Sequence, residues 1–401
     1  MTAGSHRLLI DVSQFVSWPT ATGVQRVLRH LAENWGGDEV EAWYGFIDKK
    51  RYVTGPLEAF SSVIASSFTT APRNGRRIAA EVDYITTELH AAAERILTPD
   101  DVEATFDAYL LPEPTLRADS LSVLTRLRNS RRTRPFIVYY DALPLTHPQF
   151  HPRNADVHAA VTRYHRTVSE FDNVAFISEA ARQVFEMRIA RRRPKNAVVI
   201  RLGADALRGH ANAPTNPPTF TVVGTIEPRK RHRLVLSVFE QLWAGGHRFE
   251  LLVLGARGSE RPELFDKLEF LSQSRPMRWI DQVDDRDISD ALSRSSALVF
   301  LSDAEGYGLP PLEALALGCP VIVSASLPAL EGLPELGQVR LMSVEAETLR
   351  RAVELLADPE QNRAYRSRIR DLDLPSWSGF SRAIENWVAS GCESRLVTRL
   401  P

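Results

Sequence analysis

The sequence predicts an α/β protein made of two Rossmann-like domains, whose parallel sheets carry helices on both faces and which face each other across a cleft. Three observations predict this class. The chain has 401 residues, more than one hydrophobic core ordinarily serves. Short apolar runs alternate with amphipathic segments along the chain, as in repeated strand–helix units. A stretch rich in Pro and Asn, 209–218, separates two such series and is typical of a linker.

These observations divide the chain into a first domain at 1–207, a linker at 208–218, a second domain at 219–375 and a closing helical segment at 376–401. Apolar runs predict strands in both domains. The expected strands are 7–12, 40–46, 135–141, 173–177 and 197–200, then 220–224, 250–254, 277–280, 297–301 and 321–324. Residues 50–130 resemble an insertion with two helical patterns, about 78–96 and 116–128, and we expect them to cover an acceptor side.

Composition narrows the class of protein. The apolar fraction of 44% is that of a globular chain, and the formal charge of −1 gives no whole-chain attraction for nucleic acid. Two cysteines, Cys319 and Cys392, provide no disulfide framework. With no signal-peptide pattern and no apolar run near 18 residues, we expect a cytoplasmic protein.

Basic residues cluster at 76–77, 131–134 and 191–193. Each cluster is either a solvated surface or a patch that contacts a membrane surface or an anionic acceptor. The second interpretation would make the protein peripheral at the inner face of the plasma membrane.

The stretch 300–317, FLSDAEGYGLPPLEALAL, contains the most informative pattern. An apolar strand is followed by a turn with Gly306 and Gly308, and then by a helix that Pro310 and Pro311 open. A Gly-rich turn between a strand and a helix N-terminus can cradle an anionic group. Because prolines lack an N–H, the N–H groups that remain for an anion are mainly those at 307–309, which belong to Tyr307, Gly308 and Leu309.

Two carboxylates accompany this turn. Glu305 lies at the carboxyl end of the strand, where open α/β sheets bind ligands, and Glu313 follows eight residues later. A carboxylate accepts hydrogen bonds from hydroxyl groups. Two of them beside an anion cradle therefore favour a ligand that combines phosphate with sugar.

The strand at 220–224 ends at Gly224 and is followed by the loop Thr-Ile-Glu-Pro-Arg-Lys-Arg, which contains Arg229 and Lys230. Cations at the start of a helix oppose its dipole. The arrangement therefore indicates a polyanion site, although a solvated helix start is the alternative.

The first domain offers two candidates. Gly23 opens a helix after a strand and a loop, where its missing side chain would let backbone approach a ligand, and plain packing is the alternative. Asp141 lies at the carboxyl end of a strand, and a turn-forming role is the alternative. No cluster of His, Cys and carboxylates has metal-ligand spacing. The two Asp-x-Asp sequences, at 285–287 and 371–373, lie in or beside polar helical stretches.

The motif EGYGLPPLE resembles the signature of the retaining GT-B glycosyltransferases of family 4, the group 1 type, and the run VGTIEPRK resembles a second motif of that family. The resemblance covers most of 7–390 and is weakest over 50–130. It departs at Tyr140, where a His is usual, and at Thr225, where an Arg is common.

The resemblance implies roles for the matched residues. Glu305 would face the donor sugar, Glu313 would hold the ribose, and the glycine turn would hold the diphosphate. Lys230, with Arg229, would neutralise the leaving diphosphate. The loop with Gly23 would lie against the donor diphosphate or the acceptor, and the closing helix would cross back to the first domain.

The expected function is therefore metal-independent transfer of a hexose, with retention, from a nucleotide-diphosphate sugar to a glycan or lipid-linked acceptor, as in cell-surface polysaccharide or glycolipid synthesis. No cofactor and no magnesium are expected. Two alternatives stay open, a GT-B sugar-nucleotide epimerase and a non-catalytic sugar-nucleotide-binding protein.

Overall fold

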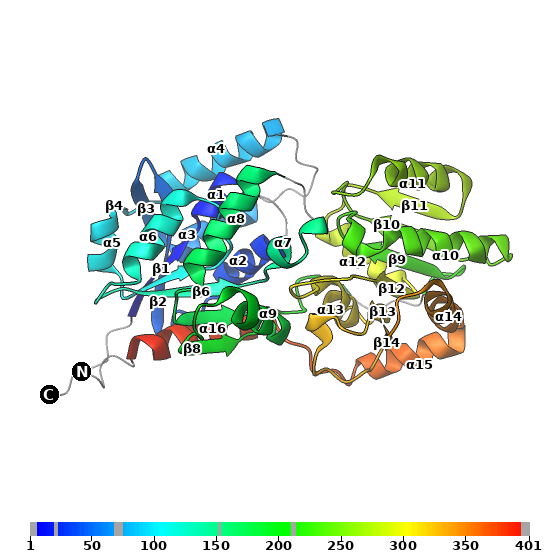
Figure 1. Ribbon diagram of the computed structural model, residues 1–401. Helices are drawn as coiled ribbons and strands as arrows, with labels where there is room; N and C mark the ends of the chain where they lie inside the picture. The colour runs from blue at the N-terminus through cyan, green and yellow to red at the C-terminus, as the bar shows by residue number, and fades with distance from the viewer. Residues whose placement is uncertain (1–5, 20–22, 68–74, 151–153, 210–213, 394–401) are drawn as a thin grey trace. The chain divides into compact units, whose positions relative to one another are not determined.

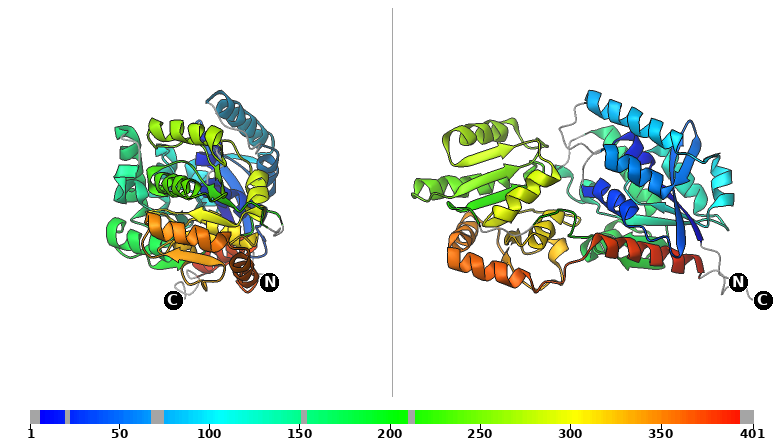
Figure 2. Two further views of the ribbon diagram at one scale, coloured as in Figure 1. Left: turned by 90° about the vertical axis from the view of Figure 1, so that its right-hand side faces the viewer. Right: turned by 180° about the vertical axis from the view of Figure 1, so that it is seen from behind.

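The computed structural model describes residues 6–19, 23–67, 75–150, 154–209 and 214–393, and it divides into two compact units (Figures 1 and 2). Unit 1 comprises 1–145, 153–203 and 376–401, and unit 2 comprises 146–152 and 204–375. The residues 204–218 thus group with unit 2, and so does the short segment 146–152. The closing helix groups with unit 1.

Unit 1 contains an eight-stranded sheet in the order β4-β3-β2-β1-β5-β6-β7-β8. Its strands are β1 (His6–Asp11), β2 (Val40–Asp48), β3 (Arg51–Pro56), β4 (Arg95–Leu97), β5 (Ala108–Leu111), β6 (Arg134–Tyr139), β7 (Asn173–Phe176) and β8 (Asn196–Val199). In the part of this order that runs β2-β1-β5-β6-β7-β8, neighbouring strands pair in parallel, as predicted. At the edge, β3 pairs antiparallel with β2 and with β4.

Residues 50–130 are not an insertion, and this corrects the sequence-based expectation. They supply β3, β4 and β5, and β5 lies in the centre of the sheet between β1 and β6. All four residues of β5 are buried. A strand covered on both faces has no alternation of polar and apolar residues, so its pattern does not distinguish it from a short helical segment.

Helices cover both faces of this sheet (Figures 1 and 2). On one face α16 packs on α2, and α2 packs on α3, while α6 and α8 are neighbours on the other. The helices of unit 1 are α1 (Ser13–Ser17), α2 (Gly23–Glu33), α3 (Leu57–Ser67), α4 (Gly75–Ala91), α5 (Pro99–Thr105), α6 (Ala118–Leu127), α7 (Leu143–Thr146, ending in unit 2), α8 (Ala155–Val168), α9 (Glu179–Val184), the π-helix η2 (Phe185–Ile189) and α16 (Trp377–Glu393).

The helix α16 is fastened to unit 1 by a buried carboxylate. Glu385, only 4% exposed, accepts hydrogen bonds from the N–H groups of Glu39 and Val40, at 3.2 and 3.3 Å. The ring of Trp387 packs edge-on against Phe136 of β6. These contacts join α16 to the start of β2 and to β6.

Unit 2 contains a six-stranded, wholly parallel sheet in the order β11-β10-β9-β12-β13-β14. The strands are β9 (Thr219–Val223), β10 (Glu250–Leu254), β11 (Met277–Ile280), β12 (Ala297–Phe300), β13 (Val321–Ser324) and β14 (Gln338–Leu341). The first five match the strands that the sequence predicts for this half of the chain, and their ends differ by no more than one residue.

The helices of unit 2 enclose one hydrophobic core between the sheet and α10, α11 and α14. The helices α12 and α13 contact β9, β12 and β13. The helices of unit 2 are η1 (Pro148–Phe150), η3 (Pro228–Lys230), α10 (His232–Ala244), α11 (Pro262–Ser274), α12 (Asp285–Arg294), α13 (Leu309–Ala316), η4 (Pro328–Leu330), α14 (Ala346–Ala357) and α15 (Pro359–Ile369).

No helix in the described part of the chain is both long enough and apolar enough to cross a bilayer.

Candidate functional site

The carboxyl ends of β9 and β12 are the natural place for a ligand in unit 2. The two strands are neighbours, but the chain leaves β9 toward β10 on one side and leaves β12 toward β13 on the other. Ligands of open α/β sheets bind at such a point of divergence. The loops that follow these two strands are those in which the sequence places its candidate residues.

Lys230 lies at the end of η3, with its ammonium group folded back toward the sheet. Its Nζ lies 5.3 Å from the ring centroid of Phe300, the last residue of β12. A Cβ added at Gly224 would collide with this Nζ, and Gly224 also has a φ of +130°. A glycine at 224 therefore allows the turn and leaves room for the ammonium group.

Burial lowers the pKa of the Lys230 ammonium, and the positive charge of Arg229 adds to this effect, while Glu305 and Glu227 oppose it. Burial thus disfavours the charged form of Lys230 by more than the two carboxylates favour it. An anionic ligand at this position would therefore gain from Lys230 and would raise the pKa of the ammonium again.

The guanidinium of Arg229 connects the two loops. It donates to Glu227 at 2.8 Å and to the carbonyl oxygen of Ala304 at 3.0 Å, and it forms an ion pair with Glu305. The Arg229 and Glu305 side chains are 14% and 12% exposed. Burial alone would lower the pKa of Arg229, but the two carboxylates raise it. Arg229 thus fixes the orientation of Glu305.

A second bridge reinforces this junction. Arg231 has a left-handed backbone with φ of 54°, and its Nε donates to Asp303 at 2.6 Å. The N–H of Asp303 donates in turn to the carbonyl oxygen of Arg229 at 2.9 Å. The loop after β9 and the loop after β12 are therefore held together by both backbone and side chains.

The glycine turn after Glu305 is compact. Gly306, Tyr307 and Gly308 are buried, and the carbonyl oxygen of Tyr307 accepts the N–H of Ala329 at 3.0 Å. Gly308 has a φ of +99°, and a Cβ there would lie 2.7 Å from Leu327. Only glycine combines this backbone with this space.

The helix α13 begins at Leu309, directly after Gly308, and carries prolines in its first turn. Glu313, in the middle of this helix, is 2% exposed. The structure thus brings the turn, Glu305, Arg229 and Lys230 to one edge of the sheet, and it places Glu313 one helical turn inside.

The candidates of the first domain lie in unit 1. Gly23 is the exposed first residue of α2. Asp141 follows β6, and its carboxylate accepts the N–H of Leu143 at 2.9 Å, as a turn-forming Asp does. Tyr140 is 4% exposed and donates to the carbonyl oxygen of Pro112 at 2.7 Å, so its hydroxyl belongs to the core of the unit.

Sequence reasoning missed several charged residues. Glu227 orients Arg229, and Asp303 orients Arg231. Glu227 belongs to the same sequence run as Lys230. In unit 1 sequence reasoning missed Asp11 and Glu113, which are both 2% exposed at the carboxyl ends of β1 and β5. Carboxylates after two neighbouring strands would have been the signal, but β5 itself was not recognised.

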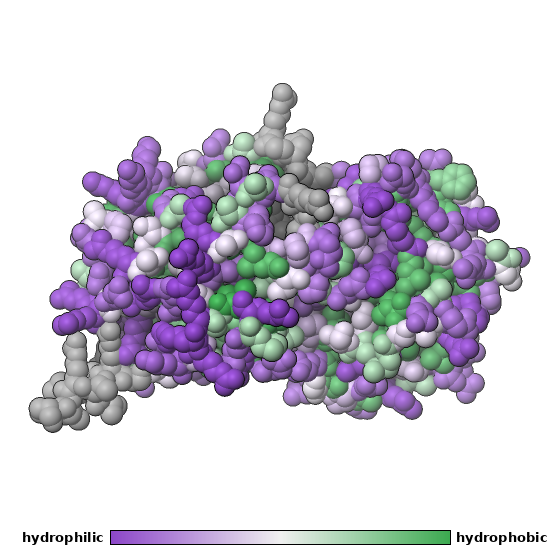
Figure 3. Space-filling view, in the orientation of Figure 1, coloured by the Kyte–Doolittle hydropathy of each residue, from purple (hydrophilic) through white to green (hydrophobic). Residues whose placement is uncertain are grey.

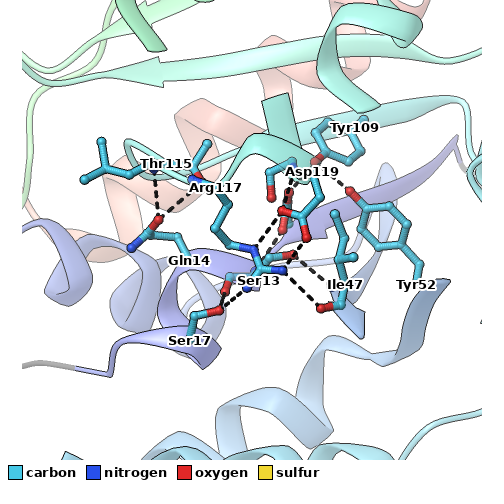
Figure 4. A network of polar contacts seen from close by, with 12 residues as sticks. Ser13, Gln14, Ser17, Ile47, Tyr52, Tyr109, Thr115, Arg117 and Asp119 are labelled. Atoms are coloured by element: carbon cyan, nitrogen blue, oxygen red, sulfur yellow. Dashed lines mark hydrogen bonds and ion pairs between the residues drawn. The ribbon is translucent and has the colours of Figure 1, made fainter. Parts of the chain in front are cut away.

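Unit 1 also contains a polar network at this edge (Figure 4). Gln14 of α1 accepts from the N–H of Leu116 at 3.0 Å, and Arg117 donates to Asp119 at 3.0 Å and pairs with Ser17. These bonds tie α1 to the loop after β5.

The two acidic residues, Asp11 and Glu113, are buried at the same edge of the sheet. Asp11 accepts from the Ser13 N–H at 2.8 Å and from the hydroxyl of Tyr109. Burial, assisted by the charge of Asp11, raises the pKa of Glu113 to about 8. Glu113 is therefore a neutral acid inside unit 1 at neutral pH.

The described residues contain no group of three or more His, Cys, Asp or Glu arranged to hold a metal ion. Of the two Asp-x-Asp sequences, the first includes Asp287, which caps α12 together with Asp284 through bonds of 2.7 and 3.1 Å.

Comparison with known proteins shows which family and which solved structures this chain resembles. Residues 204–371, nearly all of unit 2, match the family described as glycosyl transferases group 1. The chain is 28% identical over 350 residues to the serotype-specific mannosyltransferase WbdA of Escherichia coli, covering 80% of this chain and 38% of WbdA. A segment is 34% identical over 113 residues to the O-antigen chain mannosyltransferase B of Escherichia coli, covering 27% of this chain and 30% of that protein.

The chain thus spans about two fifths of the length of the WbdA relatives. Among solved structures, the sucrose-phosphate synthase of Thermosynechococcus elongatus has a TM-score of 0.64 at 15% identity, covering 96% of this chain and 98% of the other. The Anabaena protein HepE, in complex with UDP and glucose, has a TM-score of 0.62 at 15% identity, covering 97% and 100%. These likenesses confirm the predicted fold class, GT-B.

Proposed function

We propose that the chain transfers a sugar from a nucleotide-diphosphate sugar to a glycan or lipid-linked acceptor, on the premise that residues 204–371 match the family described as glycosyl transferases group 1. The observation that carries the proposal is the junction of the loops after β9 and β12, where Lys230, Arg229 and Glu305 meet. The names of the Escherichia coli relatives support a mannosyl donor and a polysaccharide acceptor.

The chemical demand is electrostatic. Breaking the bond between sugar and phosphate leaves a diphosphate whose charge grows toward the transition state, and fixed cations and N–H groups aimed at that charge lower the barrier. We assign this role to Lys230, whose ammonium group lies at the end of β12, 5.3 Å from the ring centroid of Phe300. The backbone of the turn at Tyr307, Gly308 and Leu309 would receive the phosphates at the start of α13.

The carboxylates divide the rest of the donor. Glu305, oriented by Arg229, would hold the sugar hydroxyls, and Glu313 would hold the ribose. Arg229 then acts through Glu305 more than through the phosphate, because both of its carboxylate partners are already in place. Gly23 and Asp141 of unit 1 are proposed to face the donor diphosphate or the acceptor.

Retention at the sugar carbon is part of the proposal. The sequence shows no Ser-His-Asp or Cys-His arrangement and no carboxylate placed as a nucleophile. The acceptor would therefore attack on the face that the diphosphate leaves, and a phosphate oxygen of the donor would take the acceptor proton. The reaction needs no metal in this scheme, because Lys230 supplies the compensating charge.

A panel of sugar nucleotides tests the proposal. Transfer or slow hydrolysis of one donor supports it, isomerisation without hydrolysis would assign an epimerase, and binding without turnover would assign a non-catalytic partner. A thermal-shift series with the matching nucleoside diphosphates identifies the base, since a ligand that binds only the folded state raises the melting temperature.

A further inference from the structure

Two arginine clusters that lie about 60 residues apart in the sequence line one open recess of unit 1. The recess has a volume of about 1000 Å³ and lies at the amino ends of β6, β7 and β8. Its lining includes five cations, Arg128, Arg134, Arg191, Arg192 and Lys195, and two carboxylates, Glu170 and Asp172. Because it lies at the amino ends of the strands, it is separate from Asp141, which follows the carboxyl end of β6.

The charges on this face are layered. Arg193 is 85% exposed while its partner Glu186 is 16% exposed, and Arg191 is 61% exposed while Glu170 is 31% exposed. Arg192 is likewise more exposed than Asp172, at 49% and 35%, whereas Arg128 and Glu170 are nearly equal, at 35% and 31%. In most of these pairs the cation is therefore the outer partner. Figure 3 shows hydrophilic side chains gathered over α8 and β8 of this unit. A flat object that approaches this face meets positive charge first.

An apolar side chain accompanies the cations. Met187, on η2, is 72% exposed, and the exposed Arg188 follows it directly. An exposed apolar group beside lysines and arginines is the combination that settles at a lipid interface, where the cations meet headgroups and the apolar group enters the acyl boundary.

We propose that this face of unit 1, defined by Arg128, 131–134, Met187 and 191–195, is a docking surface for an anionic lipid bilayer. Charge complementarity supports a negatively charged plane. Proteins that hold single-stranded nucleic acid stack bases on aromatic side chains, and the large exposed hydrophobic group of the described part of this face is a methionine. The proposal is independent of the donor chemistry in unit 2.

The experiment is flotation of the whole chain with vesicles of phosphatidylcholine alone or mixed with phosphatidylglycerol. We expect binding to the mixed vesicles, little binding to the neutral ones, and release at high salt, because surface charges are screened. Equal binding to both kinds of vesicle, or none to the anionic kind, would overturn the proposal. Retention by a single-stranded oligonucleotide without vesicle binding would assign the surface to nucleic acid instead.

Variants locate the surface. The triple change Arg191→Gln, Arg193→Gln and Lys195→Gln should weaken binding to anionic vesicles at least tenfold. A matched triple in unit 2, Arg286→Gln, Arg351→Gln and Arg363→Gln, removes the same charge from other exposed positions and should bind as the parent does. Equal loss in both triples would show that net charge, not this surface, directs binding.

Two single changes guard against a folding defect in the triple variant. Arg193→Gln and Met187→Ser alter side chains that are 85% and 72% exposed, and both should keep the parental melting temperature. Each should weaken vesicle binding several-fold, and parental binding by both would overturn the proposal.

Discussion

The carboxyl ends of β9 and β12 in unit 2 and those of β1 and β5 in unit 1 are equivalent places in two sheets, yet they are built in opposite ways. In unit 2, Lys230 and Arg229 bring positive charge to the junction. In unit 1, Asp11 and Glu113 are buried acids, with Asp11 bonded to Ser13 and Tyr109.

This difference shows that equivalent positions in the two sheets need not have the same function. The place where strands diverge is favourable for ligands in both sheets. In unit 1, however, a polar network ties α1 to the loop after β5 (Figure 4), Ser13 and Tyr109 hold Asp11, and burial raises the pKa of Glu113. In unit 2 burial lowers the pKa of the Lys230 ammonium group, although Glu305 and Glu227 oppose this shift. The sign of the charge therefore distinguishes the two places: a cation such as Lys230 suits the anionic ligand that we propose for unit 2, and a buried acid such as Glu113 does not.

Substitution of Glu113 has the largest expected effect, a change in folding stability, and it tests the structural side of the comparison. Its pKa is raised from 4.5 to about 8 by burial, so the folded state binds a proton that the unfolded state releases between those values. Stability is full below about pH 4.5 and falls as pH rises to about 8. Glu113→Gln removes this loss, and at pH 8 it should be more stable than the parent by on the order of 4 kcal/mol.

Chemical denaturation at several pH values measures this effect. The stability of Glu113→Gln minus that of the parent should grow from pH 5 to pH 8 and then stay constant. Glu58→Gln, at an exposed position of α3, serves as the control and should show no such trend. A pH-independent difference for Glu113→Gln would contradict the buried neutral acid.

Substitutions of Lys230 test the functional side of the comparison, the proposed role of the cation in unit 2. If Lys230 neutralises the leaving diphosphate, Lys230→Ala should lower turnover roughly a hundredfold or more, equivalent to about 3 kcal/mol of transition-state stabilisation. Lys230→Arg should keep part of the activity, because the charge survives while the geometry changes.

Lys267→Ala is the matched control, since Lys267 pairs with Glu240 on the surface of the same unit and should retain full turnover. Steady-state kinetics with the identified donor and a melting curve with nucleoside diphosphate measure both variants. Full activity and an unchanged ligand-induced shift in Lys230→Ala would remove Lys230 from the mechanism.

The two glutamates sharpen the comparison within unit 2. Glu305→Gln should lower kcat roughly tenfold, because a contact to the sugar strengthens as charge develops. Glu313→Gln should instead raise the donor KM with kcat nearly unchanged, because the ribose does not change during the reaction. Equal effects of both changes on KM alone would show that the two carboxylates do not divide these roles.

The smallest expected effect is that of metal removal. With Lys230 supplying the positive charge, we expect dialysis against a chelator to leave the rate of transfer unchanged. Activity lost in the chelator and restored by magnesium or manganese would show that a cation completes the site.

The sequence predicted unit 2 almost strand for strand, and it predicted unit 1 unevenly. Strands such as β9 and β10 are short apolar runs followed by clear turns and helices, so each strand–helix unit is legible by itself. In 50–130 the strands β3 and β4 form an antiparallel edge, and β5 has four residues that are all buried. Such a segment contains neither the alternation nor the length that would identify it.

By itself, the sequence determined the local parts of the site. The glycines at 224 and 308, the prolines that open α13 and the order of Arg229 and Lys230 specify backbone turns within single strand–helix units, and such turns depend on residues a few positions apart. Tertiary structure alone decided that β9 lies beside β12, that Arg229 therefore reaches Glu305, 76 residues away, and that Glu113 is neutral beside Asp11. Strand order and burial depend on contacts between distant segments, and the composition of a short stretch does not contain them.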